Sequence, residues 1–198
     1  MVKVKNRVVL SGLFDKSDST LPASFTSQVP AEVQTSYIHP DDRGLLTDPA
    51  RGLALGPGQQ LFRGITFTEP DDVRELTNGM ELDLAGVRIV VDHAPGHTPG
   101  SVTFRLPTAA EPGTLFSGDL LFAGSIGRTD LPGGDYATIL DSLARVCLPL
   151  PDETEVLAGH GPATTIGAER WSNPFLAGLG ERDPGAPSVP GAPRPTGM

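Results

Sequence analysis

The sequence contains only one cysteine among its 198 residues, Cys147, so a disulfide within the chain is impossible. Residues 143–148 around it form an apolar helical stripe, which predicts a buried thiol in the core rather than a nucleophile. Long apolar runs are also lacking, since no segment approaches the roughly 20 residues that a membrane-spanning helix needs. The apolar run at 8–14 is at the short limit for a signal peptide, and no small-residue cleavage site follows it. The sequence therefore predicts a cytoplasmic protein without a membrane partner.

Basic residues are outnumbered: 15 Lys and Arg stand against 24 Asp and Glu, which gives a formal net charge of −9. Phosphate binding needs clusters of basic residues, so we expect no nucleic-acid partner. All three lysines lie within the first 16 residues, and every later basic residue is an arginine. This change in composition predicts three parts: an atypical N-terminal segment at 1–36, a domain at 37–176, and a disordered Pro/Gly tail at 177–198.

Alternating apolar residues predict strands at 80–84, 87–91, 102–106, 114–117 and 155–158, the first two joined in a hairpin at Ala85-Gly86. A helical period over 135–147, with Asp135 as N-cap, predicts one helix, and 164–171 predicts another. Residues 70–76 are expected to form a helical turn. Strands first, followed by a strand–helix–strand–helix order, predict an α/β fold with a mostly antiparallel sheet and flanking helices.

Three chemically reactive side chains follow predicted strands, and each of them lies beside glycine. His97 is in the loop after 87–91, Asp119 follows 114–117, and His160 follows 155–158. Imidazole nitrogens and carboxylate oxygens are zinc ligands, and a catalytic zinc needs about three of them plus an open position for water. Their order and placement therefore predict a metal site. Arg128 is a candidate for binding a substrate carboxylate; the alternative is that it contacts Asp130 or the backbone and shapes its own loop.

Five motifs together resemble those of the metallo-β-lactamase superfamily, and among its members the small glyoxalase II-like (hydroxyacylglutathione hydrolase-like) metallo-hydrolases. These motifs lie at 93–101, 115–119, 124–130, 132–135 and 156–162. The resemblance implies an αββα sandwich, two zinc ions, and a metal-bound hydroxide that attacks the carbonyl of a small thioester or ester. It also implies that His97 binds the first ion, that Asp119 bridges both and that His160 binds the second. His39 and His93 occupy positions that are not ligands in this family.

The family's His-x-His-x-Asp-His motif, which supplies two ligands to each metal, is expected ahead of Tyr37. This chain has four histidines, at positions 39, 93, 97 and 160, and therefore lacks the motif. The compositional break at 1–36 falls at the same place. We interpret it as a different segment that has replaced the start of the domain, for example through an altered start site or reading frame, leaving the N-terminal half of the fold incomplete.

Two ligands per ion is fewer than zinc sites normally have, so we expect weak or absent metal binding and impaired hydrolysis by this chain alone. Two alternatives stay open. One is a catalytically inactive remnant that acts as a binding module. The other is a mononuclear iron enzyme of the persulfide-dioxygenase kind. The sequence indicates neither the substrate nor the oligomeric state.

Overall fold

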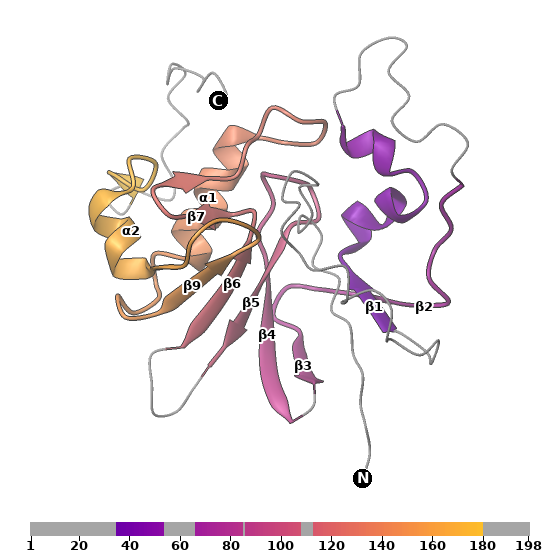
Figure 1. Ribbon diagram of the computed structural model, residues 1–198, viewed down its shortest axis with the longest axis horizontal. Coiled ribbons are helices and arrows are strands. Elements are labelled where there is room, and N and C mark those ends of the chain that lie inside the picture. The colour runs from indigo at the N-terminus through magenta and orange to yellow at the C-terminus, as the bar shows by residue number, and fades with distance from the viewer. Residues whose placement is uncertain (1–34, 54–65, 85, 108–112, 180–198) are drawn as a thin grey trace.

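The computed structural model describes residues 35–53, 66–84, 86–107 and 113–179. Most of the predicted N-terminal segment and the tail from residue 180 lie outside these ranges. The main element is a six-stranded sheet in the order β10-β9-β6-β5-β4-β3 (Figure 1). Its strands are β3 (Glu81–Leu84), β4 (Val87–His93), β5 (Val102–Leu106), β6 (Thr114–Gly118), β9 (Glu155–Ala158) and β10 (Thr164–Thr165). Within this six-stranded sheet only the β6–β9 pair is parallel, which confirms the predicted, mostly antiparallel sheet.

Two helices cover one face of this sheet. Helix α1 (Tyr136–Val146) begins at Asp135, whose carboxylate accepts a hydrogen bond from the backbone N–H of Thr138 and satisfies a donor at the helix start. Helix α2 (Ile166–Ser172) starts two residues later than predicted, because the preceding Thr164–Thr165 pairs with β9. The apolar sides of both helices pack on the sheet in one buried cluster, formed by Leu115, Val156, Ile139, Leu143, Ile166 and their neighbours.

This cluster also contains Leu179, which is 4% exposed. The packed core thus continues three residues beyond the predicted end of the domain at 176, because Leu176 and Leu179 lie one turn apart and both face the cluster. The predicted domain boundary and tail stay predictions, since residues 180–198 lie outside the described ranges.

The opposite face of the sheet carries a second buried cluster, to which Val91, Phe104 and Phe116 contribute. Phe116 lies on this side while its neighbour Leu115 lies on the helix side, as the alternation of side chains along a strand requires. Tyr37, from outside the main sheet, also packs in this cluster. The α/β class is therefore confirmed, with apolar layers on both faces of one sheet.

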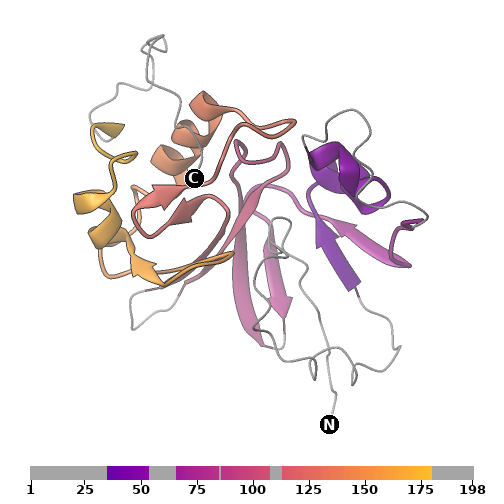
Figure 2. The ribbon, with the colours of Figure 1, turned by 45° about the horizontal axis from the view of Figure 1, so that its top comes forward.

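Tyr37 belongs to a small separate sheet, in which β1 (Thr35–Ile38) pairs in parallel with β2 (Asp72–Glu75) (Figure 2). Two short 3₁₀ helices, η2 (Pro40–Leu46) and η3 (Pro49–Gly52), follow β1. The helical turn predicted at 70–76 is wrong, because these residues are held as a strand by β1 and by a hydrogen bond from Thr35 Oγ1 to Asp72. Short strands β7 (Leu121–Phe122) and β8 (Ser125–Ile126) form a hairpin after β6. Within the described residues, no helix is both long and apolar enough to cross a membrane.

Candidate metal centre

Three strands of the main sheet end at the same edge. Strands β4 and β6 are each antiparallel to β5, so they run in the same direction, and β9 is parallel to β6. His97 follows β4, Asp119 follows β6, and His160 follows β9. The topology therefore brings all three predicted ligands to one rim of the sheet.

The two oxygens of Asp119 face different imidazoles. Oδ2 lies 3.5 Å from Nε2 of His97, and Oδ1 lies 3.9 Å from Nε2 of His160. Two donors bound to one tetrahedral zinc at its usual distances lie ~3.4 Å apart. The first pair fits that separation, and the second is slightly wider. A carboxylate that offers one oxygen to each of two imidazoles is the arrangement that a bridge between two cations requires.

The carboxylate of Asp119 is enclosed by backbone that only glycine can provide. A Cβ atom on Gly159 would overlap Asp119 Oδ1, and a Cβ atom on Gly127 would overlap the backbone oxygen of Asp119. Gly118 has a φ of +53°, a left-handed conformation that favours glycine, at an irregularity in the β6–β9 register. The side chain of Asp119 is consequently only 11% exposed. Glycines beside the predicted ligands thus allow close approach of the chain.

His97 is oriented by a backbone group that the sequence did not identify. Its Nδ1 lies 2.8 Å from the carbonyl oxygen of Arg128. A carbonyl only accepts, so Nδ1 carries a proton, and Nε2, which faces Asp119, is the nitrogen that a neutral His97 would offer to an ion. A ligand histidine characteristically donates its second ring N–H in this way. In the sequence, only the motif at 124–130, which contains Arg128, marks the segment that makes this contact.

The side chain of Arg128 forms a two-point ion pair with Asp130, with both N–O distances at 2.7 Å. This is the loop-shaping contact that the sequence offered as the alternative to substrate binding. The guanidinium lowers the pKa of Asp130 to about 2. Both side chains are largely exposed, so the substrate-binding role of Arg128 stays a prediction.

His160 is the most exposed of the three predicted ligands, with 59% of its side chain accessible. Its ring lies 4.5 Å from that of Phe122 in the β7–β8 hairpin. That hairpin is held by α2: Glu169 Oε2 accepts from the backbone N–H of Gly124, and Asn173 donates to the carbonyl of Ser125. Helix α2 therefore supports His160 indirectly.

A model of the metallo-beta-lactamase superfamily matches residues 31–160, about two thirds of the chain. The chain belongs to the metallo-β-lactamase superfamily. An uncharacterized protein of Mycobacterium tuberculosis is 51% identical over 148 residues, which is 73% of this chain and 65% of the relative. The hydroxyacylglutathione hydrolase GloC of Haemophilus influenzae is 49% identical over 98 residues, which is 50% of this chain and 45% of the relative.

Two solved structures of the same fold are similar as well. The B3 metallo-beta-lactamase BLEG-1 is 46% identical with a TM-score of 0.61, over 73% of this chain and 66% of that one. The protein TTHA1623, in a di-iron-bound form, is 42% identical with a TM-score of 0.56, over 72% of this chain and 65% of that one. The chain thus spans about 65% of the length of the Mycobacterium tuberculosis relative and of TTHA1623.

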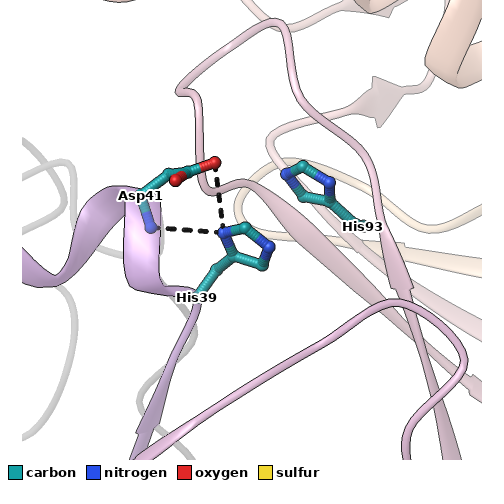
Figure 3. Close-up of side chains that lie close together, drawn as sticks. All are labelled: His39, Asp41 and His93. Carbon is teal, nitrogen blue, oxygen red and sulfur yellow. Dashed lines mark hydrogen bonds and ion pairs between the residues drawn. The ribbon is translucent and has the colours of Figure 1, made fainter.

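A second group of possible metal donors lies near the end of β4, the strand that precedes His97. One donor atom from each of His39, Asp41 and His93 lies within 4.8 Å of the others (Figure 3). The two imidazoles, however, are stacked, with ring centroids 3.9 Å apart and planes 5° from parallel. Nitrogen lone pairs lie in the ring plane, so parallel rings cannot both point at one ion.

Both rings of this stacked pair also have other partners. His39 Nδ1 accepts from the backbone N–H of Asp41, and His93 Nε2 donates to the carbonyl of Pro99. Burial and then the neighbouring His93 lower the pKa of His39. The group therefore packs β1 against the end of β4 and fits a metal less well than the three donors around Asp119.

Proposed function

We propose that this chain is a metal-dependent hydrolase of the glyoxalase II-like kind, with a small thioester or ester as substrate. The observation that carries the proposal is the contact of both Asp119 oxygens with imidazoles from two other strand ends. The name of the Haemophilus influenzae relative, a hydroxyacylglutathione hydrolase, supports the thioester class.

In this proposal His97 and Asp119 would hold one ion, and Asp119 and His160 would hold the second. A bound zinc ion would supply Lewis acidity and would lower the pKa of a water molecule to near neutrality. The protein's own part is placement: the Arg128 carbonyl fixes the tautomer of His97, and the glycine-lined backbone fixes Asp119. Arg128 would bind a substrate carboxylate that displaces the Asp130 carboxylate from its guanidinium.

The number of donors limits the strength of binding. Each ion receives two protein ligands from this set, whereas zinc sites in proteins use three or four. Loss of an outer-shell partner alone weakens metal affinity ~10–100-fold, and the loss of a direct ligand should cost more. We therefore propose that residues 1–198 alone bind zinc weakly and hydrolyse thioesters poorly.

Metal analysis of the purified chain, followed by calorimetric titration with zinc, tests this proposal. We expect weak zinc binding that Asp119→Asn abolishes and that Asp48→Asn, at an exposed carboxylate outside the site, leaves intact. Tight binding of two zinc ions would contradict the proposed impairment. Equal binding by Asp119→Asn would show that the site is wrong.

The same measurement separates the two alternatives. Purified protein with one tightly bound iron would favour the persulfide-dioxygenase-like enzyme, and TTHA1623 shows that a protein of this fold accepts iron. Absence of any metal, combined with no hydrolysis of thioester or ester substrates, would favour the inactive binding module.

A further inference from the structure

A buried carboxylate lies close to the His97 loop but comes from a distant part of the chain. Asp42, in η2, is 1% exposed. Its Oδ2 accepts a hydrogen bond from Thr98 Oγ1 at 2.6 Å, and its Oδ1 accepts one from the backbone N–H of Gly100 at 2.9 Å. The two partners follow His97 by one and three residues. Asp42 thus joins η2 to the loop that carries a predicted ligand.

An ionised Asp42 fixes one arrangement of the hydrogen atoms in this network. A carboxylate only accepts, so the Thr98 hydroxyl hydrogen is directed to Asp42. The hydroxyl of Ser101, 2.7 Å from Thr98 Oγ1, must then donate to Thr98, and it accepts from the backbone N–H of Thr98 at 3.0 Å. Every donor has one acceptor, which favours a single conformation of the loop.

Close packing restricts the loop further. A Cβ atom on Gly100 would lie 2.6 Å from the Asp42 carboxyl carbon. On its other side the loop is attached to the start of α1, because the carbonyl of Gly96 accepts from the backbone N–H of Asp135 at 2.8 Å. His97 therefore lies between two anchors, one of which is Asp42.

We propose that Asp42 is a positioning residue of the metal centre, which holds the His97 imidazole in place through Thr98 and Gly100. This inference rests on the proposed metal-dependent function for its effect on metal binding. Its effect on the loop does not depend on that function.

The test compares Asp42→Asn and Asp42→Ala with Asp48→Asn. Asp48 is an exposed carboxylate in the same segment whose side chain does not cap η3, so its variant is a matched control. Asparagine keeps one acceptor oxygen for Gly100, but its NH₂ group can only donate to Thr98 Oγ1. The Thr98–Ser101 hydrogen bond then has to reverse, and the hydroxyl hydrogen of Ser101 loses its acceptor in this network. Alanine satisfies neither Thr98 nor Gly100.

Two measurements are made on folded protein well below its unfolding temperature. The first is cobalt(II) affinity, followed by visible absorption as well as by calorimetry. We expect Asp42→Asn to bind ~10–100-fold more weakly than the parent chain, as outer-shell changes do, and Asp48→Asn to be unchanged. The second is amide hydrogen exchange, for which we expect faster exchange in residues 96–101 but not in β6 or β9.

The outcomes separate this inference from the proposed function. If the parent chain binds no cobalt, the proposed function fails, and exchange in 96–101 alone decides whether Asp42 positions the loop. Exchange that increases equally over the whole sheet would indicate a general effect on stability and overturn the inference, as would unchanged cobalt affinity in a chain that binds it. If Asp42→Ala does not fold, Asp42→Asn decides.

Discussion

Replacing Gly159 by alanine should disturb the candidate metal centre directly. The added Cβ atom would overlap Asp119 Oδ1, so the carboxylate has to move by about 1 Å to reach ordinary contact distance. Gly159 does not have a left-handed backbone conformation, so the steric overlap is the only cost of the substitution.

The expected magnitudes follow from this displacement. Overpacking of a closely packed site costs about 1–3 kcal/mol of unfolding free energy. Metal–ligand distances tolerate only ~0.2 Å of change, and the displacement is several times larger. Zinc affinity should therefore fall by at least about 10-fold, which is the lower end of the loss caused by outer-shell changes.

The assay is urea unfolding of the metal-free chain combined with zinc calorimetry, and Gly86→Ala is the control. Gly86 has a φ of +81° in the β3–β4 turn, at the opposite edge of the sheet, and a Cβ atom there meets nothing within 4 Å. A left-handed alanine costs about 1–2 kcal/mol, so the control is similarly destabilised but should bind zinc normally. If both variants bind zinc as the parent chain does, the overlap with Asp119 is irrelevant to metal binding and the reasoning fails.

Three further predictions concern stability and reactivity. Burial raises the pKa of Cys147 to about 12, so the thiol should react with DTNB only after unfolding; rapid reaction of the native chain would contradict this. His39 has a lowered pKa because of burial, so the unfolded chain takes up the proton more readily and unfolding free energy should fall as pH drops through about 6.5. In urea titrations His39→Asn, which keeps an N-cap acceptor, should flatten that dependence, and an unchanged slope would exclude His39 as its origin. Leu143→Ala, in the core, should lower the unfolding free energy by about 2–5 kcal/mol in thermal unfolding. Trp171→Ala, at a side chain 92% exposed, should lower it by less than about 0.5 kcal/mol. Similar losses for both variants would contradict the packing described.

The strands and helices that the sequence predicts correctly are those with local signals. The hairpin at 81–93 has alternating apolar residues and a glycine turn, and α1 has both a helical period and an N-cap at Asp135. The β1–β2 pair has no such signal, because residues 72–75 become a strand only through partners 37 residues earlier in the chain. Tertiary pairing therefore overrides the local preference there.

The same distinction applies to the candidate site. His97, Asp119 and His160 could be selected because each follows a strand and lies beside glycine, and the sheet topology brings them together. Their supporting groups could not be selected in that way. The Arg128 carbonyl is a backbone atom without a residue signature, and Asp42 reads in sequence as an ordinary acid at the start of a helix.

Metal binding can be limited by the number of donor atoms or by how well those atoms are placed. In this chain the two limits are not equally severe. His97 and Asp119 are 13% and 11% exposed and have their positions fixed by backbone groups, so little side-chain entropy remains to be lost when an ion binds. His160 is 59% exposed and has a ring contact as its described support, and it lies farther from the carboxylate. Asp119 and His97 are therefore the two predicted ligands whose positions are most restricted before any ion binds. In the proposed function, weak binding then follows from too few ligands per ion and not from ligands that are badly placed.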